Sequence, residues 1–440
     1  MADLLAMSAR VIDEGLAPPE LGPLNRINHQ LSEIADGVAM VEAFSHCVLF
    51  ETDDGLVAFD TSGPAGGGLV VEAVRRWRPK DRFNTVVYTH GHVDHVGGAG
   101  AFVADAEGRS DPRPRFAGHE NVPKRFDRYE MTDGYNRVIN ARQFGQFIRA
   151  GYSIGGEARF LPAATPRPDT TYAHALDLEV GGLDVHLRHA RGETDDHTWA
   201  WIPARKAICA GDFFIWNFPN AGNPQKAQRY PLEWAGAMRA MAAQGADLFL
   251  PAHGLPIAGQ ARIDKVLTDV AEVLEKLVAD TLAMMNAGAR LNEIVHEVFV
   301  DPDTLARPWL RPLYDEPEFV VRNIWRLYGG WYDGNPANLK PARETALAAE
   351  LASLAGGPDR LANRALQLAD ADIRLACHLA ELAVQAAPDS VHAHGARAEV
   401  FQRRRDLETS LMAKGIFGSA ANESKAKLAE DGSDSATPRG

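Results

Sequence analysis

Residues 89–95 (THGHVDH) place three imidazoles and a carboxylate within six positions, directly after the apolar run 85–88 (TVVY). Such polar side chains avoid burial unless a partner compensates them, and a divalent cation is the partner that histidine and aspartate share. The first two histidines of H-x-H-x-D-H alternate along a turning segment, whereas the Asp-His pair can reach a second ion. Glycines at 91, 97 and 98 indicate a loop that enters a helix. We therefore expect a site for two metal ions here, and surface or core histidines are the alternative.

Composition limits the classes of protein to which this chain can belong. Its 440 residues suffice for two domains, and 45% hydrophobic with 24% charged residues is ordinary for a soluble globular protein. A net charge of −13 without a basic stripe argues against a nucleic-acid partner. No membrane span is visible, and the N-terminus lacks the basic start and apolar core of a signal peptide. Cys47, Cys209 and Cys377 are widely separated in apolar surroundings, so we predict reduced thiols and a cytoplasmic location.

The pattern T-H-x-H-x-D-H-x-G-G at residues 89–98 resembles the signature of the metallo-β-lactamase-fold hydrolases. The resemblance covers residues 1–258 and implies an αββα sandwich with further metal ligands at strand ends. Residues 192–194 (GET) stand where most of the family has G-H-T, so a carboxylate replaces an imidazole. Asp212 follows an apolar strand where the family has a bridging carboxylate, and His253 matches the final ligand.

The resemblance implies a ligand set for two divalent ions per chain. One ion would be held by His90, His92 and Glu193, the other by Asp94, His95 and His253, with Asp212 between them. The donor set favours zinc, and manganese or iron also fits because Glu193 adds a hard oxygen donor. His189 is expected to belong to a strand, and His197 to support a ligand from behind.

Local patterns agree with the sandwich. Apolar segments at 47–50 and 56–60 flank the turn at 53–55 and predict a hairpin, after which a helix is expected over 68–77. Asp60 ends the second strand of the hairpin, where the resemblance implies that it lies near the metals and can orient a ligand histidine. Strands alternating with helices, with ligand-bearing loops along one edge, are typical of this α/β (α+β) architecture.

Glu193 resembles the alkylsulfatase branch of the superfamily, and a second segment agrees. Residues 327–339 (LYGGWYDGNPANL) are similar to the G-W-x-D-G-N-P-x-x-L segment of that branch's helical dimerisation domain. From residue 260 onwards the apolar spacing is helical, and helices are predicted over 343–355, 359–368, 370–386 and 390–406. We predict a catalytic domain over 1–258, an all-α dimerisation domain over 259–421 that makes a homodimer, and a disordered tail over 422–440. A tetratricopeptide-like array is the alternative reading of the helices.

The resemblance implies a dinuclear metal-dependent hydrolase that cleaves an alkyl sulfate ester with a metal-bridging hydroxide. The substrate would be a small anionic molecule with an apolar portion. Besides Asp94, the residues predicted to act on it follow the strand that ends before Asp212: Asn220, Arg229 and Tyr230. Arg229 suits bidentate binding of an anion, and a surface ion pair is its alternative role.

The chain departs from the branch at two positions. Pro219-Asn220 stands where the long alkylsulfatases have His-Asn, and Asp212 where they have a bridging Glu. The missing histidine leaves proton delivery to a leaving alcohol open. Hydrolysis of a lactone or carboxylic ester on a secondary metabolite or xenobiotic is therefore one alternative, and a metal-free binding or scaffold protein is another. Aromatic residues after the metal motif either line an apolar pocket or pack the insertion: Phe126, Tyr129, Tyr135, Phe144, Phe147 and Tyr152.

Overall fold

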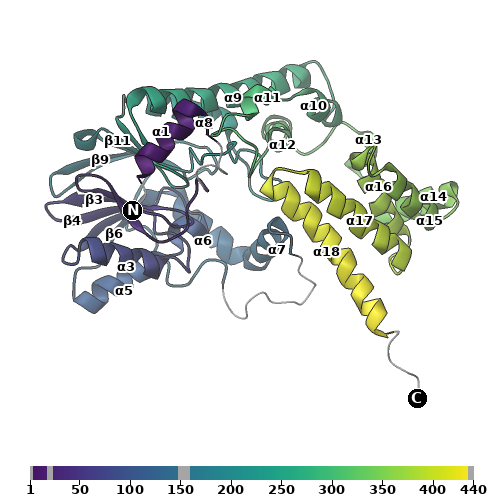
Figure 1. The fold of residues 1–440 in the computed structure, drawn as a ribbon, viewed down its shortest axis with the longest axis horizontal. Coiled ribbons are helices and arrows are strands. Elements are labelled where there is room, and N and C mark those ends of the chain that lie inside the picture. Colours follow the sequence, from purple (N-terminus) through teal and green to yellow (C-terminus); the bar gives the residue numbers. More distant parts are fainter. Residues whose placement is uncertain (1–2, 17–22, 147–158, 435–440) are drawn as a thin grey trace. The chain divides into compact units, whose positions relative to one another are not determined.

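The computed structural model describes residues 3–16, 23–146 and 159–434. The chain forms two compact units, one from Met1–Asp133 with Ala158–Gly330 and the other from Gly134–Glu157 with Trp331–Gly440. The first unit contains both sheets, and the second is helical in its described part (Figure 1).

The first sheet has seven strands that follow one another in chain order. They are β1 (Leu31–Ala35), β2 (Val38–Val41), β3 (Cys47–Thr52), β4 (Gly55–Phe59), β5 (Phe83–Val87), β6 (Arg115–His119) and β7 (Thr170–Tyr172). The predicted hairpin is confirmed, because β3 and β4 pair antiparallel from Thr52 and Gly55. Gly55 has a φ of +99°, and a Cβ there would lie 2.4 Å from the carbonyl oxygen of Arg82, so this turn requires glycine.

The second sheet has six strands in the order β13-β12-β11-β10-β9-β8. They are β8 (Ala175–Val180), β9 (Leu183–His189), β10 (Thr198–Ile202), β11 (Ala207–Gly211), β12 (Leu248–Pro251) and β13 (Ile257–Ala258). A 3₁₀ turn, Pro203–Arg205, joins β10 to β11. The strands β11 and β12 pair in parallel, so their carboxyl ends meet at one edge of the sheet.

Helices cover the outer faces of the two sheets, which gives the predicted αββα sandwich (Figure 1). On the first sheet lie α3 (Gly67–Trp77), α5 (Ala99–Arg109) and α6 (Asn121–Met131), and on the second lie α8 (Pro231–Ala242) and α9 (Gln260–Asn286). Alternation along β3 divides the core, because Val48 and Phe50 face the space between the sheets while Cys47 and Leu49 face α3 and α5. Two further helices of this unit are α1 (Leu4–Glu14), near its N-terminus, and the short α4 (Val93–Val96), which follows β5.

The predicted start of the helical domain at residue 259 differs from the observed division of the chain. Helix α9 begins at Gln260 as expected, but its apolar face, including Ile263 and Leu267, is buried in the same core as the second sheet. That core also takes in apolar side chains of the next helices, α10 (Leu291–Glu297) and α12 (Pro317–Gly329). These helices and the short α11 (Pro302–Leu305) belong to the first unit, which therefore extends to Gly330.

In the described part of the second unit, the four predicted C-terminal helices are accompanied by two more, α13 before them and α18 after them. Its helices are α13 (Pro336–Leu339), α14 (Glu344–Ala355), α15 (Pro358–Leu368), α16 (Ile373–Ala386), α17 (Val391–Leu407) and α18 (Leu411–Asp434). The disordered tail predicted over 422–440 is wrong up to residue 434, because these residues continue α18. Most of α7 (Asp133–Gln143) belongs to this unit, and α18 holds the segment that follows α7 through Ser419 Oγ, which donates to the carbonyl oxygen of Gln146 at 2.7 Å.

The aromatic residues after the metal motif divide between the two units. Phe126 and Tyr129 are buried in the core between the first sheet and its helices, so they contribute to the packing of the fold. Tyr135 and Phe144 belong to the second unit and are exposed, whereas Phe147 and Tyr152 fall outside the described residues. Among the described helices, none combines the length and apolar character that a bilayer crossing needs.

Candidate metal centre

The THGHVDH segment leaves the sheet after β5 and enters α4, as the glycines around it predict. The turn after α4 approaches a neighbouring loop so closely that a Cβ on Gly98 would lie 2.2 Å from the carbonyl oxygen of Thr61. Only glycine allows this approach. His90 and His92 therefore lie on the loop, while Asp94 and His95 lie on α4.

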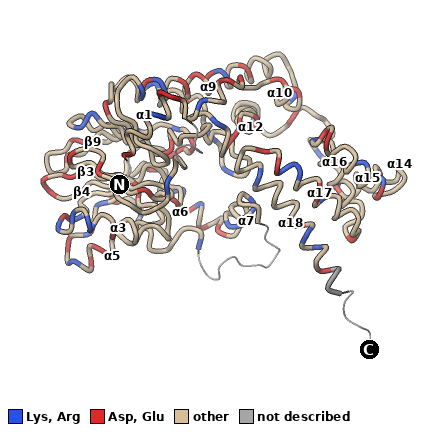
Figure 2. Tube along the Cα trace, viewed as in Figure 1, with Lys and Arg blue, Asp and Glu red and all other residues tan. Residues whose placement is uncertain are grey.

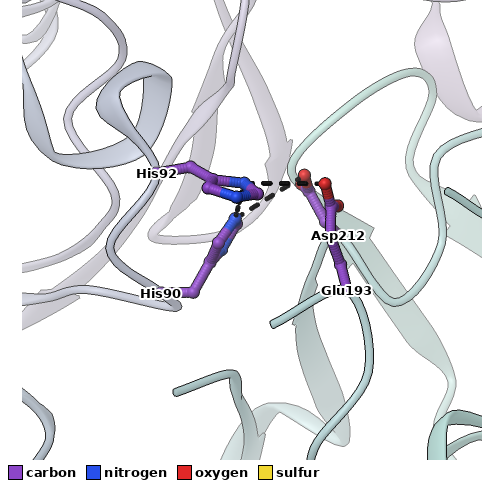
Figure 3. Close-up of side chains that lie close together, drawn as sticks. All are labelled: His90, His92, Glu193 and Asp212. Carbon is purple, nitrogen blue, oxygen red and sulfur yellow. Dashed lines mark hydrogen bonds and ion pairs between the residues drawn. The ribbon is translucent and has the colours of Figure 1, made fainter. Parts of the chain in front are cut away.

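Four side chains form the first group of candidate ligands. His90 Nε2 lies 2.8 Å from His92 Nδ1, and Glu193 Oε1 lies 3.6 Å from His92 Nδ1. Asp212 Oδ2 lies 3.8 Å from His90 Nε2. One ligand atom from each residue lies within 4.8 Å of the others. Figure 3 shows both imidazoles pointing toward the two carboxylates, which approach from the opposite side.

Asp94, His95 and His253 form the second group. Asp94 Oδ2 lies 3.7 Å from His95 Nε2 and 3.6 Å from His253 Nε2. His253 follows β12, so the parallel pairing of β11 and β12 places it beside Asp212, which follows β11. The structure thus brings together, in two adjacent groups, the seven side chains that the sequence predicts as ligands.

Asp212 faces both groups with different oxygens. Its Oδ1 lies 3.3 Å from His95 Nε2 and 3.4 Å from His253 Nε2, while its Oδ2 faces His90. This is the arrangement expected of a carboxylate that two cations share. The position that the resemblance implied for Asp212 agrees with these distances.

The unmet hydrogen-bonding capacity of the groups fits a pair of cations. Among the described residues, Glu193 Oε2 is buried without a hydrogen-bond partner, and His95 Nε2 and Asp212 Oδ1 make no hydrogen bond of good geometry although they lie 3.3 Å apart. Buried polar atoms are costly when unpaired, so three of them at the ligand positions indicate a missing partner. Four imidazoles and three carboxylates are also the donors that divalent metals take in proteins.

The protonation tendencies agree with this fit. Burial lowers the pKa of His90 and of His92 well below the usual range, which keeps their nitrogen lone pairs available. Burial acts in the same direction on His95, but Asp212 and Asp60 outweigh it and raise the pKa of that imidazole. A proton on His95 then supplies the positive charge that the carboxylates require when no cation is bound.

Asp60 holds one ligand from behind, as predicted. Its Oδ2 lies 2.7 Å from His95 Nδ1 and accepts from Thr89 Oγ1 at 2.7 Å, while its Oδ1 accepts from the Thr89 amide at 2.8 Å. Thr89 Oγ1 lies 3.1 Å from His90 Nδ1. Asp60 has a left-handed φ of 58°, a conformation that residues other than glycine adopt rarely and that is concentrated at functional sites. This network orients one histidine of each group.

His197 also supports a ligand, as expected, although the ligand is Asp212. Its Nε2 accepts from the Asp212 amide at 3.1 Å, and its ring stacks on Phe213 at 4.2 Å. His189 belongs to β9, as expected, and its Nδ1 lies 2.8 Å from the carbonyl oxygen of His197. Neither side chain is in the two candidate ligand groups.

Two of the predicted substrate residues instead contact Glu193. Asn220 Nδ2 donates to Glu193 Oε1, and Arg229 donates to the backbone carbonyl of Glu193. A second guanidinium nitrogen of Arg229 lies 3.3 Å from Glu193 Oε1. Arg229 is only 2% exposed, so the surface ion pair considered as its alternative role is wrong. Tyr230 is partly buried, and the guanidinium of Arg191 lies 4.6 Å from the centre of its ring.

Two further residues near the candidate ligands, Asp196 and Lys226, were not predicted from the sequence. Asp196 Oδ2 accepts from the Gly91 amide at 3.0 Å and from Arg125 Nε at 2.9 Å, which anchors the loop that carries His90 and His92. Lys226 lies where burial and Arg229 lower its pKa to about 8, against the attraction of the carboxylates of both groups. The only sequence signals for them were an acidic pair, Asp195-Asp196, that begins two residues after Glu193, and a lysine between Asn220 and Arg229.

The sandwich with paired ligand groups at its strand ends defines a metallohydrolase of the metallo-β-lactamase type. The model of the metallo-beta-lactamase superfamily matches residues 41–253, and that of the alkyl sulfatase dimerisation domain matches residues 290–427. Residues 41–253 therefore carry a metallo-β-lactamase superfamily domain, and residues 290–427 carry an alkyl sulfatase dimerisation domain.

Several relatives of the chain are named alkylsulfatases. A linear primary-alkylsulfatase from Pseudomonas sp. is 26% identical over 87% of this chain and 74% of its own length. An (R)-specific secondary-alkylsulfatase from Pseudomonas sp. is 26% identical over 82% of this chain, which spans 57% of that relative. The structure of the stereoselective inverting sec-alkylsulfatase Pisa1 from Pseudomonas sp. matches with a TM-score of 0.79 and 22% identity, covering 91% of this chain and 66% of its own. That likeness supports the fold.

Proposed function

We propose that the protein is an alkylsulfatase that uses two divalent metal ions per chain to hydrolyse a small sulfate ester with an apolar portion. The single observation that carries this proposal is Asp212, whose two carboxylate oxygens face two complete groups of ligands. The names of the relatives supply the substrate class. Zinc is the proposed metal, because imidazoles form the majority of the candidate ligands.

The residues of the chain have distinct roles in this proposal. His90, His92 and Glu193 would hold one ion, Asp94, His95 and His253 the other, and Asp212 both. When bound, the ions would activate a water molecule and stabilise negative charge on the substrate. The side chains keep this chemistry in a buried setting, where electrostatic interactions are stronger than in water.

Positive charge beside the ligand groups would attract the sulfate ester. Arg229 is committed to Glu193, which makes it a support for the ligand and only indirectly an anion site. Lys226 is the stronger candidate for contact with the substrate, because its ammonium interacts electrostatically with carboxylates of both groups. Asn220 and Tyr230, in the same loop, remain proposed as residues that act on the substrate.

One position favours a second candidate function. Pro219 cannot deliver a proton, and it stands where the resemblance to the long alkylsulfatases implies a histidine. A poor alkoxide leaving group needs an acid, whereas a lactone or an activated ester can be hydrolysed with metal assistance alone. Hydrolysis of such an ester is therefore the alternative within the same site.

The homodimer, the location and the range of partners stay predictions. The alkyl sulfatase dimerisation match supports a homodimer through the helical region. Three free cysteines suit the reducing cytoplasm that we predict. Figure 2 shows lysines and arginines mixed with acidic residues along the long helix α9. The expectation that nucleic acid is not a partner stays a prediction.

The deciding experiment measures metal content together with release of inorganic sulfate. The purified protein is given short and long, primary and secondary alkyl sulfates, with lactones and aryl esters in parallel. We expect about two metal ions per chain and sulfate release that stops on chelation and returns with zinc. Two ions with ester or lactone turnover but no sulfate would establish the alternative. A folded protein that binds no metal would reject both functions.

A further inference from the structure

The loop over residues 217–230 connects β11 to α8 and carries Asn220 and Arg229, both of which contact Glu193. No regular strand or helix begins within the loop to fix its backbone. Its backbone groups instead bind residues 311–323, roughly a hundred positions later in the sequence. The position of Glu193 thus depends on contacts that lie outside the sandwich sequence itself.

Asp315 anchors the first half of the loop. Its side chain is fully buried, and its Oδ2 accepts from the Gly222 amide at 2.6 Å and from the Asn223 amide at 3.1 Å. Gly222 also lies against the first turn of α12, where a Cβ would be 2.5 Å from the backbone of Phe319. Asp315 therefore fixes the chain two residues after Asn220.

Asn323 on α12 anchors the second half. Its Nδ2 donates to the carbonyl oxygen of Arg229 at 3.0 Å, and its Oδ1 accepts from the Arg229 amide at 3.2 Å. The same oxygen accepts from Gln228 Nε2 at 2.8 Å. A buried amide that pairs with both backbone groups of one residue determines the direction in which that residue's side chain leaves the chain.

We propose that Asp315 and Asn323 are positioning residues of the metal centre, which hold Asn220 and Arg229 against Glu193. The segment from 290 to 330 falls within the alkyl sulfatase dimerisation match, yet it packs in the same compact unit as the sandwich. This part of the match is then a structural component of the catalytic site. The inference rests on the proposed role of Glu193 as a ligand, while its test requires no substrate.

The test measures the two stepwise zinc affinities by competition with a chelator in the full-length protein. His92→Ala and Asp94→Ala identify which affinity belongs to which group. We expect Asp315→Ala and Asn323→Leu to weaken the affinity that His92→Ala removes by roughly 10–100-fold, because partners behind a metal ligand contribute on that scale. The affinity that Asp94→Ala removes should change much less.

Two further variants separate positioning from general damage. Asp315→Asn keeps an acceptor for Gly222 and Asn223, so it should restore most of the lost affinity. Arg322→Ala lies on the same helix, removes only an exposed ion pair with Glu318, and should leave both affinities unchanged. Unchanged zinc binding in Asp315→Ala and Asn323→Leu would overturn the proposal, and so would an equal loss of both affinities. Absence of sulfate release by the wild-type protein would reject the proposed substrate without altering this result.

Discussion

Asp212 lies between the two groups of candidate ligands and faces both of them. Its oxygens lie 3.3 Å from His95 Nε2 and 3.8 Å from His90 Nε2. A carboxylate in that position could offset the charge of two ions at once. The other ligands, by contrast, belong to one group each, which makes the effects of individual substitutions separable.

We expect His92→Ala and Asp94→Ala each to reduce bound metal from about two ions to about one per chain, and to abolish turnover. Asp212→Asn should weaken binding of both ions, because it removes the shared negative charge. Elemental analysis after dialysis measures the content. His174→Ala, which changes an exposed histidine outside the groups, is the matched control. Full occupancy and activity in Asp94→Ala would contradict the assigned second group.

Asp60 provides a second prediction at the same scale. Its carboxylate is 2.7 Å from His95 Nδ1 and also holds Thr89, so Asp60→Ala frees the ring of one ligand to rotate. We expect the zinc affinity of the second group to fall roughly 10–100-fold. Asp53→Ala, at an exposed turn of the first sheet, serves as control. An affinity equal to that of the wild-type protein would show that Asp60 serves Thr89 alone.

The elements bring these residues together from separate parts of the chain. The ligands follow β5, β9, β11 and β12, and the segment after α11 together with α12 then secures the loop that follows β11. Asp315 holds this loop as a buried hydrogen-bond acceptor, and its burial disfavours the charged form of the carboxylate. Burial raises the pKa of Asp315 to about 6, even though three backbone amides favour the ionised form.

This cost should be visible in the pH dependence of stability. The folded protein binds more protons at Asp315 than the unfolded chain between their two pKa values, 3.8 and about 6. The contribution of Asp315 to the free energy of unfolding is therefore most favourable below pH 3.8 and is lost as the pH rises through about 6. At higher pH the total loss approaches about 3 kcal/mol. Relative to wild type, Asp315→Asn should gain stability across that interval and stay constant above it. Urea unfolding of metal-free protein at several pH values measures this difference, and a difference that falls with rising pH would contradict it.

At the scale of the whole molecule, the second unit leaves an apolar stripe exposed on α14. Leu347, Leu351 and Leu354 recur at helical spacing, and Leu354 is 76% exposed. Exposed apolar stripes of this kind commonly lie in contact with another protein, and the dimerisation match covers this helix. A second copy of the chain is therefore the partner that we predict for the stripe.

Substitution of two of these leucines tests the predicted homodimer. Leu347→Glu with Leu354→Glu would place charges in the interface, and we expect the dimer dissociation constant to rise roughly tenfold or more per site. Light scattering coupled to size-exclusion chromatography at several concentrations measures the mass. Leu407→Glu changes an exposed leucine on α17 and should keep the wild-type mass. A double variant that remains dimeric would place the interface elsewhere.

Short segments of sequence determined the local features of this protein. The spacing of His90, His92, Asp94 and His95 identified a metal motif, and alternation at 47–50 and 56–60 predicted the hairpin, because ligand spacing and periodicity lie within a few residues. The strand ends before Asp212 and His253 were readable for the same reason. The family resemblance then connected these segments into one fold.

Only the tertiary structure decided how distant segments meet. It placed Arg229 against Glu193, gave the two oxygens of Asp212 to different groups, and joined α9 through α12 to the sandwich. It also extended α18 over residues that composition alone marked as a disordered tail. Burial and pairing are properties of neighbours in space, and contacts such as those of Asp315 with Gly222 join residues 93 positions apart. No local pattern encodes them, because their free energy comes from packing of the assembled core.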